Sequence, residues 1–94
     1  METEDKLVGI ALEFQRRCVT NFQLAEVGNL SAVVEAVGQF CIANNLTWGL
    51  YFHGDRFESC VANIKGDQAS VYSTNPRQAL MMACIEMAKV LETK

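Results

Sequence analysis

The first apolar positions of the chain recur at the spacing of a helix. They lie three or four residues apart, so a helical backbone would place them on one face. These positions are Leu7, Ile10, Ala11, Phe14 and Cys18. Thr3 can cap the segment, and the pattern predicts a helix from Glu4 to Cys18. From Val19 to Leu30 the apolar spacing is irregular, which leaves open either a helical continuation or an irregular link.

The same spacing predicts two further helices. One runs from about Ala32 to Asn44 and takes Ser31 as its cap. The other begins at Asn75-Pro76, a capping residue followed by a proline suited to the first helical position, and ends near Leu91. Apolar residues cover more than one face of this last helix, so we expect it to be contacted on two sides.

Between these helices, aromatic and β-branched residues predict an antiparallel hairpin. Its strands run from Thr47 to His53 and from Arg56 to Ile64, joined by Gly54-Asp55, which suits a two-residue type II′ turn. Residues pair outward from such a turn. The predicted pairs are His53 with Arg56, Phe52 with Phe57, Tyr51 with Glu58, Leu50 with Ser59 and Trp48 with Val61. The predicted core face carries Trp48, Leu50, Phe52, Phe57 and Val61.

A third strand is predicted from Gln68 to Tyr72. Gly66-Asp67 repeats the turn chemistry of Gly54-Asp55, so we expect a second two-residue turn. The pairs that follow are Ala69 with Ile64 and Val71 with Ala62. The second face of the sheet would then hold an apolar patch of Cys60, Ala62, Ile64, Ala69 and Val71.

These elements give an α+β fold of one domain, residues 1–94, in the order α-α-β-β-β-α. Its core is a three-stranded antiparallel meander with helices packed on it. Apolar residues on both faces would call for cover on both, from helices on each side or from one helix layer and a partner chain.

Composition excludes some classes of function. The net charge of −3 argues against a protein that binds nucleic acid by neutralising many phosphates. The glycines form neither of the phosphate-binding patterns GxxxxGK[ST] and GxGxxG, so no cofactor is expected. No apolar run approaches the roughly 20 residues of a membrane-spanning helix.

The cysteines indicate a reducing compartment. They are widely spaced without a CxxC pair, and a single histidine accompanies them, so no zinc site is expected. The segment from Met1 to Lys6 lacks the basic and apolar regions of a signal peptide. We therefore expect a cytoplasmic protein with reduced thiols at Cys18, Cys41, Cys60 and Cys84.

Two groups of residues are candidates for function. The first gathers an imidazole, a carboxylate, a guanidinium and a phenol at the hairpin end, and its members are Tyr51, His53, Arg56 and Glu58. General acid-base work needs a desolvated pocket, whereas a hairpin tip is usually wet, so a binding role is favoured over catalysis. A solvated sheet face without a binding role is the third alternative and the commonest case. The second group consists of apolar residues that are candidates to face a partner, and its members are Ile64, Val71, Met81 and Ile85. For the methionines of the last helix the alternative is to fill gaps in the core, which is the commoner role of such residues.

One family resemblance can be placed on particular residues. The aromatic-rich stretch 48–52 and the proline-initiated, alanine-spaced stretch 75–83 carry it. On these residues the C-terminal half resembles small phage-encoded proteins of the ABA-sandwich type. The resemblance implies a non-enzymatic accessory protein of a phage or prophage that acts by binding a host protein.

The leading hypothesis is a cytoplasmic protein-interaction module without enzymatic activity. It forms a homodimer and binds and modulates a host protein as an inhibitor. One alternative is a small ligand-binding domain or enzyme that uses Tyr51, His53 and Glu58. The other alternative is a nucleic-acid-associated protein.

Overall fold

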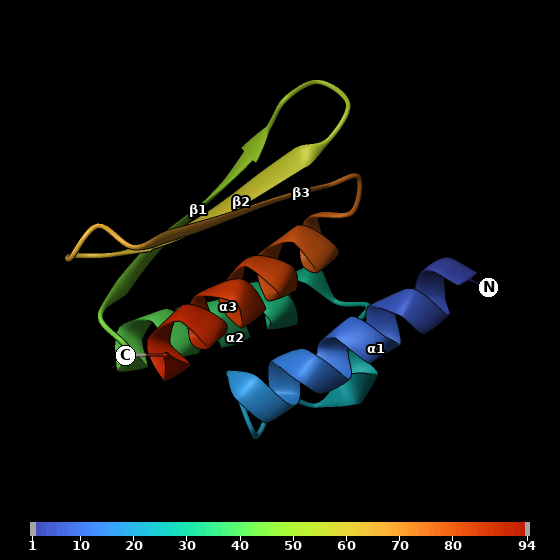
Figure 1. The fold of residues 1–94 in the computed structure, drawn as a ribbon. Helices are drawn as coiled ribbons and strands as arrows, with labels where there is room; N and C mark the ends of the chain where they lie inside the picture. Colours follow the sequence, from blue (N-terminus) through green and yellow to red (C-terminus); the bar gives the residue numbers. More distant parts are fainter. Residues whose placement is uncertain (1, 94) are drawn as a thin grey trace.

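The computed structural model describes residues 2–93 and has the predicted order of elements. They are α1 (Glu2–Arg17), the 3-10 turn η1 (Leu24–Glu26), α2 (Leu30–Ala43), β1 (Leu46–Phe52), β2 (Phe57–Asn63), β3 (Gln68–Ser73) and α3 (Pro76–Glu92). The α+β class and the succession α-α-β-β-β-α are therefore confirmed. All three helices lie on one side of the sheet, with α2 and α3 next to it and α1 farthest away (Figure 1).

Helix α1 is held by its predicted apolar face. Leu7, Ala11 and Phe14 are buried, and the Phe14 ring meets the Phe22 ring edge to face at 5.3 Å between centroids. Phe22 belongs to the stretch whose structure the sequence left open. That stretch is an irregular link with one short 3-10 turn, fixed by its buried aromatic ring and by a hydrogen bond from Gln15 Nε2 to the Phe22 carbonyl at 2.6 Å.

Helix α2 begins two residues earlier than predicted. Its cap is Asn29 and not Ser31, because the Asn29 Oδ1 accepts the amide protons of Ser31 at 3.0 Å and Ala32 at 3.4 Å. The helix ends at Ala43, and Asn45 then takes a left-handed backbone conformation with φ of 56°. The predicted end at the asparagine pair is thus close to the observed one.

Helix α3 is the centre of the molecule. Asn75 caps it by accepting the Arg77 amide proton at 3.0 Å, and Pro76 occupies the first turn as predicted. The helix contacts β2 and β3 on one side and α1 and α2 on the other. Its fully or almost fully buried residues are Ala79, Leu80, Met81, Ala83, Cys84, Ile85, Met87 and Ala88. The expectation of contact on two sides is confirmed.

The first hairpin has the predicted register. His53 donates its amide proton to the Arg56 carbonyl at 2.8 Å, and Phe52 pairs with Phe57. Gly54 has φ of +94°, which glycine adopts without strain and which the first central position of a type II′ turn requires.

The second hairpin has a different register from the predicted one. Ala69 pairs with Val61 and not with Ile64, and Val71 pairs with Ser59. The reason is a longer loop. Asn63 and Asp67 close it through a backbone hydrogen bond of 3.0 Å, and Gly66 takes φ of +98° inside it.

This register changes the composition of the two faces. Side chains alternate along a strand, so the shift brings Ala69 and Val71 to the helix-covered face. The opposite face, called here the open face, carries Thr47, Gly49, Tyr51, Glu58, Cys60, Ala62, Gln68, Ser70 and Tyr72. The expectation of a large apolar patch there is wrong. Among the described residues no helix covers this face, as antiparallel sheets allow when one side is polar.

Candidate functional site

The open face holds a row of three large side chains near the Gly54-Asp55 turn. Tyr51 pairs with Glu58 across β1 and β2, and Glu58 pairs with Tyr72 across β2 and β3. The three residues therefore stand side by side across the sheet, with Glu58 on the middle strand. His53 and Arg56 flank the row at the turn. We call these five residues the open-face cluster.

Several contacts connect the members of the open-face cluster. The His53 Nε2 and Glu58 Oε1 atoms are 2.8 Å apart, and the Arg56 guanidinium carbon lies 5.1 Å from the centre of the Tyr72 ring. The rings of His53 and Tyr72 are 5.8 Å apart between centroids. Tyr72 thus joins the group that the sequence identified. Its membership depends on the register of β3, which sequence reasoning placed wrongly.

Tyr51 has a different neighbour. A Cβ atom placed on Gly49 would come within 2.6 Å of the Tyr51 hydroxyl, so the tyrosine ring folds back along its own strand and lies over the glycine. The absence of a side chain at position 49 makes this arrangement possible.

The open-face cluster is suited to binding more than to catalysis. More than half of the Tyr51 and Tyr72 surfaces is exposed, and 46% of the His53 side chain is exposed. A general base acts efficiently when a shaped pocket excludes water from it, and the His53–Glu58 pair lies on an open surface. Within the described residues, no three His, Cys, Asp or Glu side chains are grouped so as to hold a metal ion.

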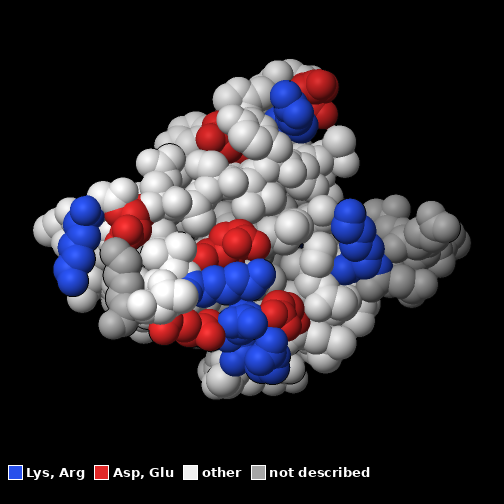
Figure 2. Space-filling model, viewed as in Figure 1, with Lys and Arg blue, Asp and Glu red and all other residues white. Residues whose placement is uncertain are grey.

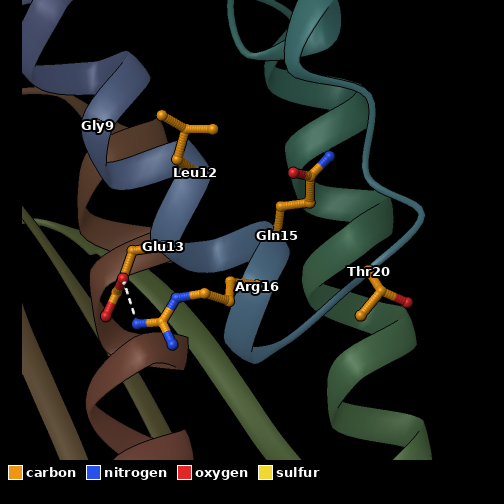
Figure 3. Close-up of a pocket in the computed structure, with 6 residues that line it drawn as sticks. All are labelled: Gly9, Leu12, Glu13, Gln15, Arg16 and Thr20. Atoms are coloured by element: carbon orange, nitrogen blue, oxygen red, sulfur yellow. Dashed lines mark hydrogen bonds and ion pairs between the residues drawn. The ribbon is translucent and has the colours of Figure 1, made fainter.

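A hollow of about 540 Å³ lies elsewhere, on the outer side of α1 and the link that follows it (Figure 3). Three of the four polar side chains that line it are already engaged: Arg16 Nη2 contacts Glu13 Oε2 at 2.8 Å, and Gln15 donates to the Phe22 carbonyl. Figure 2 shows charged side chains gathered in a band over α1 and α3 and in a small group at the hairpin end. The α1 hollow therefore offers no convergent free groups for a ligand.

The apolar residues predicted to face a partner are placed differently. Met81 is 0% exposed and Ile85 is 6% exposed, because α3 is surrounded by the sheet and two helices. Val71 is half-buried on the helix-covered face. The structure therefore gives Met81 and Ile85 the core role rather than the interface role, and it places Val71 on the face opposite to the one expected. Ile64 is exposed, but it lies in the β2–β3 loop, at the end of the sheet opposite the open-face cluster.

The predicted core face is only partly covered. Val61 is fully buried and Leu50 is half-buried, whereas Trp48 is 36% exposed and Phe52 is 62% exposed. Both exposed residues belong to β1, at the edge of the sheet. The helices therefore leave large aromatic surface uncovered along that edge.

Two of the thiols, those of Cys18 and Cys84, fit a structural role. No disulfide links them, and Cys41 and Cys84 are buried. Burial raises the pKa of Cys18 to about 12, and a hydrogen bond with Cys41 together with burial raises the pKa of the Cys84 thiol. Since the thiolate is the reactive form, neither Cys18 nor Cys84 is set up as a nucleophile.

No protein-family model matches this chain, and no significant match was found among curated proteins or solved structures. In the part of the chain that the structure describes, each helix is too short or too polar to cross a membrane.

Proposed function

We propose that this chain is a non-enzymatic protein-interaction module that binds a partner protein through the open-face cluster. The observation that carries the proposal is the exposed row of Tyr51, Glu58 and Tyr72 on the sheet face that no helix covers. Tyrosine and arginine are the residue types that most often dominate binding energy at protein interfaces, because they combine large apolar area with polar ends.

The charges of the cluster indicate what the partner presents. Glu58 pairs with Tyr51 on one neighbouring strand and with Tyr72 on the other, and the chain as a whole carries a net charge of −3. A lysine or arginine of the partner can pair with the Glu58 carboxylate while its stem covers Tyr51. The proposed partner is therefore a protein surface with a basic side chain surrounded by apolar groups.

The test is quantitative affinity capture from the cells that make the protein. We expect a partner that is retained by the wild-type chain, weakened more than about tenfold by Tyr72→Ser or Glu58→Gln, and unaffected by Ile64→Ser. Ile64 is the control because it is also an exposed large side chain but lies in the β2–β3 loop, at the end of the sheet opposite the cluster. If every captured protein is retained equally by all variants, the open-face cluster is not the binding surface.

One observation favours a second candidate function. The short contact of His53 with Glu58 also suits a small ligand-binding domain or enzyme that uses Tyr51, His53 and Glu58. That candidate requires a small molecule which raises the melting temperature of the wild-type chain and leaves that of His53→Ala unchanged. If screened ligands shift both proteins equally, this second candidate is rejected.

The narrower proposal is a cytoplasmic phage or prophage accessory protein that modulates a host protein. The residue patterns of stretches 48–52 and 75–83 are its support. The neighbouring genes test it: phage structural or regulatory genes on both sides are expected, and a metabolic operon would contradict the phage assignment.

A further inference from the structure

Strand β1 presents unpaired backbone groups along one edge of the sheet. It is an outer strand in the order β1-β2-β3. The His53 amide donates to Arg56, so the odd-numbered residues of β1 form the hydrogen-bonded pairs with β2. The amide and carbonyl groups of the even-numbered residues then point away from the sheet, and these residues are Leu46, Trp48, Leu50 and Phe52.

Nothing in the sequence of β1 protects this edge. In natural proteins, lysine, proline or a bulge in an edge strand usually prevents it from pairing with another chain. The seven residues of β1, LTWGLYF, contain no charge and no proline and pair with β2 without interruption. The exposed rings of Trp48 and Phe52 add apolar surface beside the open backbone groups. The other edge, β3, differs because its helix-side residues Ala69 and Val71 are buried and half-buried, so no large apolar side chain is exposed on that side of the strand.

We infer that the β1 edge binds the β1 edge of a second copy of this chain, antiparallel, about a two-fold axis at Gly49. This register pairs all seven residues of the strand with all seven of its partner. It also pairs residues whose backbone amide and carbonyl groups point away from the sheet with residues of the same kind, as a hydrogen-bonded ladder requires. These pairs are Trp48 with Leu50 and Leu46 with Phe52. Two-fold axes through Trp48 or Leu50 would keep the ladder but shorten the overlap to five residues.

Side chains on both faces agree with this register. On the helix side, the exposed Phe52 would cover Leu46 of the second copy, and Trp48 would cover Leu50. On the open face the two Gly49 residues meet at the axis and leave room for the Tyr51 rings, which already lie over Gly49. The self-pairing therefore buries the aromatic surface that the monomer leaves exposed.

Helix α2 extends the same surface below the strand. It contacts β1, and an uncharged stripe with four-residue spacing runs along it. The stripe consists of Leu30, Val34, Gly38 and Ile42. Leu30 and Ile42 are exposed, and Gly38 permits close approach of another helix. A second copy paired through β1 would bring its own α2 toward this stripe, which enlarges the interface beyond one strand pair.

The edge pairing shares only Tyr51 with the open-face cluster. It uses backbone groups of β1 and chiefly side chains of the helix-covered face, whereas Glu58 and Tyr72 of the cluster lie on β2 and β3. The two proposals can therefore fail separately, and the experiment below distinguishes them.

The first test measures mass by light scattering and sedimentation over a dilution series. We expect the wild-type chain to dimerise, and Phe52→Lys to raise the dissociation constant more than about tenfold. Tyr72→Lys is the matched control, because Tyr72 is an aromatic residue of similar exposure, 52%, on the other edge strand. Tyr72→Lys should keep the dimer and lose the partner protein. A wild-type chain that is monomeric at every concentration, or a dimer that Phe52→Lys leaves intact, overturns the inference.

The second test fixes the register by cross-linking. Gly49→Cys is made in a Cys60→Ala background, because Cys60 lies directly opposite Gly49 on β2 and would compete as a disulfide partner. Two residues at the axis form a non-hydrogen-bonded pair with Cα atoms about 4.5 Å apart, within disulfide reach. Oxidation should yield a covalent dimer.

The control for that register is Thr47→Cys in the same background. Its two copies would be about 13 Å apart along the strands, too far for a disulfide. Cross-linking through Thr47→Cys but not Gly49→Cys overturns the proposed register. If Gly49→Cys fails to fold, the comparison of Phe52→Lys with Tyr72→Lys still decides whether the β1 edge is the interface.

Discussion

At the scale of single residues, Ser59 is the least expected side chain in the core. It lies in the central strand β2, on the helix-covered face, and is 0% exposed. Its Oγ has no hydrogen-bond partner among the described residues. A buried hydroxyl without a partner costs roughly 1–3 kcal/mol relative to a solvated one. The position therefore holds a small residue at an energetic cost.

Replacing this hydroxyl should stabilise the protein. We predict that Ser59→Ala raises the free energy of unfolding by about 1 kcal/mol, because it removes the unsatisfied group and leaves a cavity no larger than one oxygen atom. Urea denaturation followed by circular dichroism measures the change. Ser70→Ala, at an exposed position of β3, should change the stability little. A clear loss of stability in Ser59→Ala would mean that the hydroxyl is bonded in solution.

At the scale of elements, the two hairpins show what local sequence can and cannot predict. Gly54-Asp55 lies between strands whose aromatic residues match in only one register, and the predicted pairing of Phe52 with Phe57 is confirmed. Gly66-Asp67 has the same chemistry, but the loop there begins earlier. The Asn63 side chain accepts the amide protons of Lys65 at 3.0 Å and Asp67 at 2.9 Å, which fixes a wider loop with Gly66 inside it.

The register of the second hairpin determines which residues of β3 belong to the candidate site. Moving the partner of Ala69 from Ile64 to Val61 exchanges the faces of β3, since the shift is an odd number of residues. Tyr72 therefore lies on the open face, and Val71 lies on the helix-covered face, the reverse of the prediction. The residues near the first turn were predictable because their pairing is local. The burial of Met81 and Ile85 was not predictable in the same way, because a helix that is apolar on most sides can lie either at an interface or in the middle of a core.

The Asn63 side chain is the residue to change in the second hairpin. We predict that Asn63→Ala lowers the free energy of unfolding by about 1–2 kcal/mol, since two backbone amides lose their acceptor. Hydrogen exchange should show faster exchange at the amides of Lys65 and Asp67. Lys65→Ala, an exposed change in the same loop, is the control. Equal stability of the two variants would show that Gly66 alone sets the loop.

At the scale of the whole molecule, the outer helix α1 is joined to the rest by apolar packing and by one charge network. Arg17 contacts Glu13 of the same helix at 2.6 Å and Glu92 at the end of α3 at 2.6 Å. Arg16 also contacts Glu13, at 2.8 Å. Two arginines on one carboxylate make Glu13 the most strongly paired acid in the network.

This pairing predicts how stability depends on acid. The hydrogen bonds from Arg17 and then Arg16 lower the pKa of Glu13 from 4.5 to about 2. A group whose pKa is lower in the folded state stabilises the fold above its unfolded pKa, and this contribution is lost as the pH falls through the folded pKa. The stabilisation by Glu13 is therefore complete above pH 4.5 and declines toward about pH 2.

Glu13→Gln should remove that contribution. We predict a lower melting temperature than wild type near neutral pH, and a difference that shrinks as the pH falls from 4.5 toward about 2, because wild-type Glu13 then becomes protonated. High salt should shrink the difference as well, since the network is near the surface and is screened. Glu35→Gln, at an exposed position of α2, is the control. If the Glu13→Gln difference stayed constant across this pH range, the charge of the Glu13 carboxylate, which pairs with Arg16 and Arg17 of the same helix, would not be the source of the stabilisation.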